Sequence, residues 1–212
     1  MDPNVLRSFS AEMKKEALLG TLLTMPVRHV LGKRALEREP DTARQEKLRK
    51  LLSKGDPTEI RILPDGSKQG PHYDSDSKKQ WVSVRDKEDP AVLAHELGHS
   101  ELDREFVGSV LQSKLVRIGT AVGGVGGAYA ASRGHLTIGA AIAASSYLPV
   151  LAYEGMASMR GIDRMKRVGA TEEELAAAKS KLLKAWGTYA TMPVASAGDA
   201  LTAGALSRLG RG

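Results

Sequence analysis

Apolar and polar positions follow a helical period over the first part of the chain. Apolar residues at this spacing predict one helix over Ala11–Leu23, which Pro26 ends or kinks. A second, highly charged helix is expected over about Thr42–Leu52, where a Lys-Gly-Asp-Pro sequence soon stops it. We therefore expect residues 1–57 to form a helical amino-terminal extension.

The period changes to strict alternation in two short segments, Glu59–Leu63 and Trp81–Val84, which is typical of β-strands. The connection between them is rich in turn-forming residues, so the pattern predicts a small antiparallel hairpin or sheet. Asp89 and Pro90 follow as an N-cap and a first helical residue. A helix is expected to begin there and to run to about Phe106.

Two uncharged segments, 118–132 and 136–153, come next, and Arg133-Gly134-His135 separates them as a turn. Small residues recur four apart in both segments: Gly119, Gly123 and Gly127 in the first, and Gly139 with Ala143 and Ala140 with Ala144 in the second. This spacing lets two helix backbones approach closely, so residues 110–153 are expected to form a Gly/Ala-rich helical hairpin. A membrane-spanning helix needs ~20 apolar residues, a length that each of the two segments only approaches. The hairpin is therefore expected either to be a buried pair of helices or to contact a membrane through residues 118–153.

The chain returns to amphipathic helix after Glu154. Thr171 and Glu174 make a capping box for a helix with one apolar side, and the Ala/Gly-rich tail 196–212 is expected to be flexible. The sequence thus predicts a mainly α-helical protein with a small β-element, in which residues 58–195 form one domain.

Composition and charge narrow the classes of function. There is no cysteine, which excludes disulfides and thiolate metal ligands. The net charge of +6 permits contact with anionic surfaces, but basic residues are interspersed with Glu and do not interleave with aromatic ones. We therefore expect no nucleic-acid binding. The amino terminus lacks the features of a cleaved secretion signal, so a cytoplasmic or membrane-associated protein is expected.

The sequence His95-Glu96-Leu97-Gly98-His99 places an HExxH motif inside a predicted helix. Histidines four apart lie on one helix face, so both imidazoles can reach one zinc ion. Zinc lowers the pKa of its bound water, and Glu96 can hold this water and accept its proton. Since chance gives this motif in only about one of a hundred such chains, it predicts a zinc metallopeptidase that cleaves peptide bonds.

A catalytic zinc site usually has three protein ligands, so a third ligand is needed besides the two histidines. The candidates are Glu101, Asp103, Glu105 and Glu154. A straight helix carries Glu101 and Asp103 beyond the ion. Glu154 ends a long uncharged segment, where an isolated carboxylate is costly without a partner, and a helical hairpin would return it to the motif. We therefore favour Glu154.

Three blocks of this chain resemble those of the membrane-associated neutral zinc metallopeptidases, a gluzincin group of bacterial proteins. The blocks are His72-Tyr73-Asp74 with the strand ending Trp81–Val84, then Ala94–His99, then Tyr153–Arg160. The resemblance covers roughly residues 58–195 and implies a zincin-like core. It also implies that His95, His99 and Glu154 bind zinc, that Glu96 is the base, and that peptides or proteins are the substrates.

His72 has two interpretations within this framework. It could donate a hydrogen bond to the oxyanion of a tetrahedral intermediate, as polar groups near a catalytic zinc do. It could equally cap the hairpin turn before its strand.

The amino-terminal region departs from the family. The family usually begins with a transmembrane helix, whereas residues 15–31 contain Pro26 and Arg28. The run Phe9–Lys15 resembles the amino ends of some phage virion proteins. An alternative is therefore a structural or membrane-inserting virion protein that assembles into a larger complex. A third hypothesis is a zinc ion that only stabilises the fold.

Overall fold

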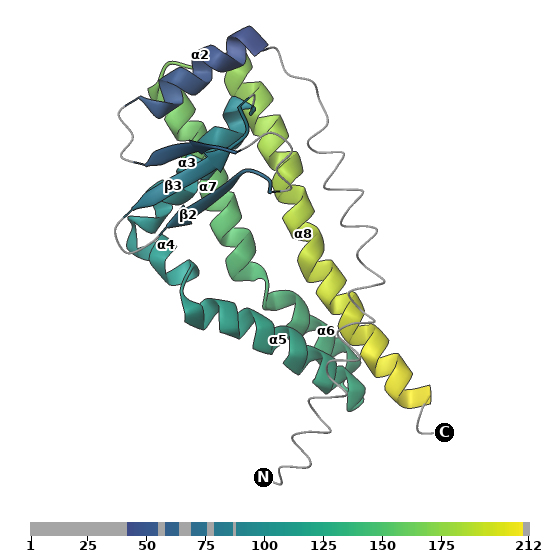
Figure 1. Cartoon of the computed structure of the whole chain (residues 1–212). Helices are drawn as coiled ribbons and strands as arrows, with labels where there is room; N and C mark the ends of the chain where they lie inside the picture. The colour runs from purple at the N-terminus through teal and green to yellow at the C-terminus, as the bar shows by residue number, and fades with distance from the viewer. Residues whose placement is uncertain (1–41, 55–57, 64–68, 76–78, 87, 210–212) are drawn as a thin grey trace. The chain divides into compact units, whose positions relative to one another are not determined.

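The described chain is mainly helical, with a small β-sheet before the helix that carries the HExxH motif (Figure 1). The computed structural model describes residues 42–54, 58–63, 69–75, 79–86 and 88–209, so the helix expected over Ala11–Leu23 and the run Phe9–Lys15 lie outside the described residues. The described elements are α2 (Thr42–Ser53), β1 (Glu59–Ile62), β2 (His72–Ser75), β3 (Gln80–Val84), α3 (Pro90–Asp103), α4 (Phe106–Leu111), α5 (Lys114–Ser132), α6 (Leu136–Ser145), α7 (Leu148–Arg167) and α8 (Glu172–Leu209). The predicted class, mainly α with a small sheet before the motif, is confirmed.

The strands of the described chain form one sheet in the order β1-β3-β2. β3 pairs in antiparallel register with β2, where Tyr73 faces Val82, and in parallel register with β1, where Ile60 faces Val82. The predicted strands β1 and β3 are thus neighbours, but they are parallel. A parallel pair needs a crossover connection, and the segment expected to be only a turn supplies β2 within that crossover.

The helix α3 begins where the sequence predicts. Pro90 is its first residue, and the side chain of Asp89 accepts a hydrogen bond of 2.7 Å from the backbone N–H of Ala91. The helix ends at Asp103, before the expected end at Phe106, and a separate short helix, α4, follows. The turn between them is tight, because a Cβ atom at Gly108 would lie 2.0 Å from the carbonyl oxygen of Leu102.

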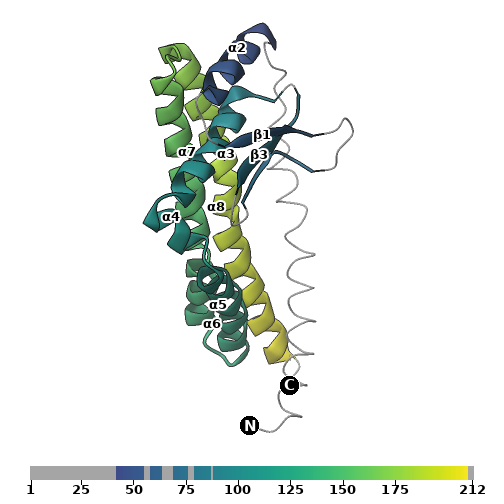
Figure 2. The same cartoon turned by 60° about the vertical axis from the view of Figure 1, so that its left-hand side comes forward.

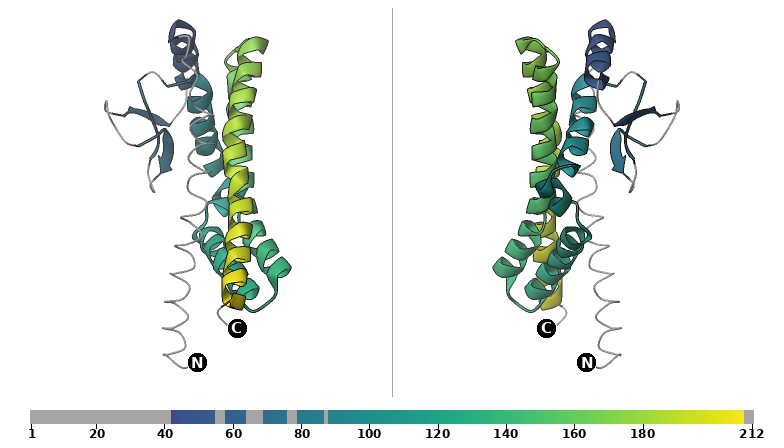
Figure 3. Two further views of the ribbon diagram at one scale, coloured as in Figure 1. Left: turned by 90° about the vertical axis from the view of Figure 1, so that its right-hand side faces the viewer. Right: turned by 90° about the vertical axis from the view of Figure 1, so that its left-hand side faces the viewer.

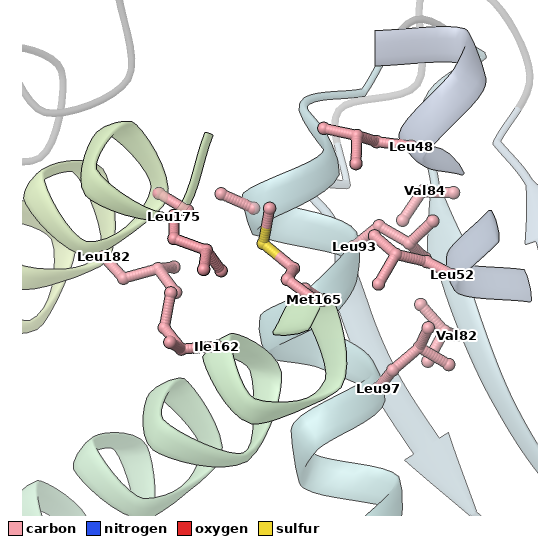
Figure 4. Packing of buried hydrophobic residues seen from close by; sticks show 13 residues of the cluster. Leu48, Leu52, Val82, Val84, Leu93, Leu97, Ile162, Met165, Leu175 and Leu182 are labelled. Atoms are coloured by element: carbon pink, nitrogen blue, oxygen red, sulfur yellow. The ribbon is translucent and has the colours of Figure 1, made fainter. Parts of the chain in front are cut away.

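Helix α3 occupies the middle of the main hydrophobic core. The sheet lies on one side of α3 and α7 lies on the other (Figure 3). Figure 4 shows the packing of this core around Met165, with side chains from α2, β3, α3, α7 and α8: Leu48, Leu52, Val82, Val84, Leu93, Leu97, Ile162, Leu175 and Leu182. The described part of the predicted amino-terminal extension, α2, therefore shares its core with the motif helix, because Leu48 and Leu52 are both buried in it.

The described residues divide into two compact units. The first, which we call the site unit, comprises the described residues of 42–112 together with Ala152–Trp186. The second, the hairpin unit, comprises Ser113–Leu151 and the described residues of 187–209. Helices α7 and α8 contribute residues to both units.

Small residues pack closely in the hairpin unit, as predicted for Gly123, Gly127, Gly139 and Ala143, whereas nothing lies within 4 Å of a Cβ placed at Gly119. A Cβ atom at Gly127 would lie 2.4 Å from the carbonyl oxygen of Gly139, so α5 and α6 are in backbone contact (Figure 2). Ala131 and Ala143 pack with Ala200 of α8. The tail expected to be flexible is therefore helical as far as Leu209, because its small side chains let α8 pack closely within this unit.

One stretch of the described chain, Leu136–Arg167, is long and apolar enough to cross a membrane. Only 17% of its apolar window is buried inside the structure. Length and composition alone do not separate a spanning helix from a core helix of a soluble protein. Membrane contact through residues 118–153 therefore stays a prediction.

Candidate metal site

Two imidazole rings converge on one face of α3. His95 and His99 are four residues apart, and their Nε2 atoms lie 3.1 Å from each other. The rings meet edge to face, with centroids 4.6 Å apart. Both side chains are largely shielded from solvent, with 13% of His95 and 7% of His99 exposed. The i, i+4 spacing of the motif therefore gives the predicted pair of nitrogen atoms on a single helix face.

Glu154 of α7 completes this cluster. Its Oε2 atom lies 3.2 Å from Nε2 of His95 and 3.5 Å from Nε2 of His99. The structure thus brings together the three residues that the sequence put forward as metal ligands, and their ligand atoms all lie within 4.8 Å of one another. His99 and Glu154 are separated by the whole α4–α6 segment of the chain.

The other carboxylates considered as a third ligand are engaged elsewhere. Glu101 forms ion pairs with Arg164 at 2.8 Å and Arg167 at 2.6 Å. Glu105 pairs with Arg160 at 2.7 Å. Both glutamates therefore pair with arginines of α7 and not with the two histidines. Asp103 instead accepts hydrogen bonds from two tyrosines, which are described below.

Glycines allow α7 to approach α3 closely enough for Glu154 to reach the histidines. A Cβ atom at Gly98, within the motif, would lie 2.1 Å from the carbonyl oxygen of Ala157. A Cβ atom at Gly161 would lie 2.7 Å from the carbonyl oxygen of Ala94. The two backbones are therefore in direct contact at both points, and a side chain at either position would push the helices apart.

Glu96 lies beside the cluster but is not one of its converging ligands. Its side chain is buried, and burial raises its pKa above the usual value, although the neighbouring His95 and His99 oppose the shift. A hydrogen bond from the backbone of Tyr73 on β2 also favours the ionised form. Glu96 is thus a buried carboxyl group held between α3 and the edge strand of the sheet.

The charge state of Glu154 is set by its neighbours. Burial by itself raises the pKa of this carboxyl group, but polar contact with His95 and His99 outweighs burial and brings the pKa to about 2. Glu154 is therefore ionised at neutral pH. Its Oε2 atom is buried, and among the described residues no hydrogen-bond donor is aligned on it.

His95 is oriented by a partner on its other nitrogen. Nδ1 of His95 lies 3.0 Å from Oγ of Ser158, one turn of α7 after Glu154. If Nδ1 donates to this hydroxyl, Nε2 carries the lone pair toward the cluster, which is the tautomer that a metal ligand needs. No role was predicted for Ser158 from the sequence, although its i+4 spacing from Glu154 places both on one face of α7.

Two tyrosines pack beside His99. The ring of Tyr153 lies 4.6 Å from the His99 ring with an angle of 28°, and that of Tyr73 lies 6.3 Å away with an angle of 17°. Both hydroxyl groups donate to Asp103, at 3.0 Å from Tyr153 and 2.8 Å from Tyr73. Burial and the charge of Asp103 raise the pKa of Tyr153, so its hydroxyl stays protonated at neutral pH.

His72, for which the sequence left two interpretations, has its ring directed to its own turn. Nδ1 of His72 lies 2.9 Å from the carbonyl oxygen of Gly70. This contact agrees with the interpretation that His72 caps the turn before β2. A role toward an oxyanion stays untested.

The geometry of the cluster fits a tetrahedral metal ion. Nitrogen and oxygen ligands lie about 2.0–2.2 Å from zinc, so neighbouring ligand atoms of a tetrahedral site are about 3.3–3.6 Å apart. The three separations here, 3.1, 3.2 and 3.5 Å, are close to that spacing. Two imidazole nitrogens and one carboxylate oxygen are also a donor set that zinc accepts. The unaligned Oε2 atom of Glu154 would gain a partner from such a cation.

Comparisons of the chain with protein-family models, with curated proteins and with solved structures found no match. The resemblance of the three sequence blocks to a metallopeptidase family therefore stays a prediction.

Proposed function

We propose that this protein is a zinc-dependent endopeptidase that hydrolyses peptide bonds in peptides or proteins. The observation that carries the proposal is the convergence of three ligand atoms, from His95, His99 and Glu154, beside the buried carboxyl group of Glu96. A purely structural metal site needs the ligands but has no use for an additional buried carboxyl group next to them. The HExxH spacing supplies two of the ligands and this carboxyl group from one helix.

His95, His99 and Glu154 would hold zinc. Bound zinc would supply Lewis acidity, which lowers the pKa of water and polarises a peptide carbonyl group. Glu154 contributes the negative charge of the ligand set, since its pKa of about 2 keeps it ionised. Ser158 holds the ring of His95 in the orientation that the site needs.

Glu96 would act as the general base and then as the acid. One of its carboxylate oxygens accepts a proton as the water oxygen attacks the peptide carbonyl carbon. The same oxygen then gives the proton to the amide nitrogen as the carbon–nitrogen bond breaks. Burial raises the pKa of Glu96 toward the pH at which a group can both take up and release a proton.

The test combines metal analysis with a cleavage assay on the full chain. We expect about one zinc per chain, consistent with the one three-ligand cluster among the described residues. We also expect cleavage of a denatured, fluorescently labelled protein, loss of cleavage on treatment with a chelator, and recovery when zinc is added back.

Protein that contains no stoichiometric zinc would refute the proposal. Zinc that raises the melting temperature without cleavage of any substrate would instead support the hypothesis of a zinc ion that only stabilises the fold. The two results can be told apart, because absence of zinc would mean that the three ligands do not bind it, whereas zinc binding without cleavage would mean that Glu96 does not act as a base.

A further inference from the structure

We propose that Asp103 is a positioning residue that holds two tyrosine rings against His99 and thereby fixes this ligand for the metal. The inference rests on the proposed zinc site and concerns how one of its ligands is supported. Asp103 does not point its carboxylate to the ligand cluster. Its two oxygens each accept one tyrosine hydroxyl, Oδ2 from Tyr73 and Oδ1 from Tyr153.

The need for such support comes from an asymmetry between the two histidines. His95 has a hydroxyl partner on Nδ1, at 3.0 Å in Ser158. Nδ1 of His99 is buried, and within the described part of the chain it has no hydrogen-bond partner. A metal-ligating histidine usually donates its second ring N–H to an acceptor, which fixes the ring orientation. The orientation of the His99 ring must therefore be fixed by another interaction.

Aromatic packing is what the structure offers in its place. The rings of Tyr153 and Tyr73 are both nearly parallel to that of His99, at interplanar angles of 28° and 17°. Rotation of the His99 ring about its bond to Cβ would bring its edge into the Tyr153 ring, whose centroid is 4.6 Å away. The imidazole can therefore turn only if the tyrosine rings move.

The carboxylate of Asp103 restricts that movement. Tyr73 comes from β2, Tyr153 from α7 and Asp103 from the last turn of α3, so one side chain ties together the three elements around the cluster. Gln112 adds a further constraint, because its side-chain amide donates to the hydroxyl of Tyr153. The hydroxyl of Tyr153 is thus held as both donor and acceptor.

Replacing Asp103 tests this inference through zinc affinity. Asp103→Ala removes both acceptors, and we expect the dissociation constant for zinc to rise by about 10- to 100-fold, the usual loss when the support of a metal ligand is removed. Asp103→Asn should remain close to wild type, because its carbonyl oxygen can accept from one tyrosine hydroxyl and its NH₂ group can donate to the other. Affinity is measured by competition with a chelator of known zinc affinity.

Two comparisons separate positioning from a general loss of stability. Glu105→Ala is the matched control, because it removes a carboxylate two residues away that pairs with Arg160 at a partly exposed position, and it should leave zinc affinity unchanged. The melting temperature of each metal-free variant is measured alongside. A structural role alone would lower that temperature in Asp103→Ala and leave the zinc affinity of the folded protein as in wild type, which would overturn the inference.

If Asp103→Ala does not fold, the double variant Tyr73→Phe with Tyr153→Phe decides the question, because it keeps both rings and removes only the hydroxyls. Zinc affinity equal to wild type in that variant would also overturn the inference. A wild-type chain that binds no zinc would instead refute the proposed function itself, so the two failures can be told apart.

Discussion

Replacing Glu96 by Gln is expected to lower the rate of peptide hydrolysis by about 10²- to 10⁴-fold, the range that a positioned general acid–base contributes. The amide of Gln has nearly the size and shape of the carboxyl group, but it cannot accept a proton at neutral pH. Glu96 is not one of the converging ligands, so zinc content should stay as in wild type. The measurements are kcat/KM on a peptide substrate and metal analysis of the same sample.

The control for this variant is Glu105→Gln. It makes the same chemical change nine residues along the chain, where the carboxylate pairs with Arg160 outside the ligand cluster. We expect it to keep both zinc and activity. Cleavage by Glu96→Gln at the wild-type rate would remove Glu96 from the mechanism, whereas no cleavage by either wild type or variant would favour a structural or virion-associated role for the protein.

The features that the sequence predicted correctly depend on residues close together in the chain. The N-cap of α3 is made by Asp89 and the backbone of Ala91, and the capping box of α8 by Thr171 and Glu174. The convergence of His95 and His99 follows in the same way from helical spacing. In each case the partners lie within four residues, so secondary structure alone determines their contact.

Glu154 is the one distant residue of the cluster that the sequence predicted, and the reason was energetic. A carboxylate at the end of a long uncharged segment needs a partner, and the histidine pair offered one. The helix packing that brings Glu154 to the two histidines could not be predicted. The direct backbone contact at Gly98 and Gly161 depends on how α3 and α7 pack, and a single glycine in a helix does not indicate its neighbour.

The remaining errors also concern long-range packing. Alternation identified β1 and β3 as strands, but it carries no information on direction, and β2 was hidden in a turn-rich segment. Helix geometry correctly set Asp103 aside as a ligand, but its partners, Tyr73 and Tyr153, come from other elements and could not be predicted. Membrane contact through the hairpin and a virion origin stay predictions.

Replacing Glu154 by Gln is expected to weaken zinc binding by at least about 100-fold. Loss of a residue that merely supports a ligand costs about 10- to 100-fold, and this change affects a ligand itself. Gln is neutral and keeps the shape of Glu, so the variant loses the one negative charge of the ligand set, which the pKa of about 2 keeps ionised in the wild type. Zinc affinity is measured by chelator competition, together with peptide cleavage.

Comparison of Glu154→Gln with Glu96→Gln separates loss of a metal ligand from loss of the general base. Both variants change one carboxyl group to an amide, and both groups are largely buried within one cluster. Glu96→Gln should retain zinc and lose cleavage, whereas Glu154→Gln should lose both, with cleavage partly restored when zinc is in large excess. Full zinc affinity in Glu154→Gln would mean that another residue supplies the third ligand, and it would contradict the arrangement of His95, His99 and Glu154 as a metal site.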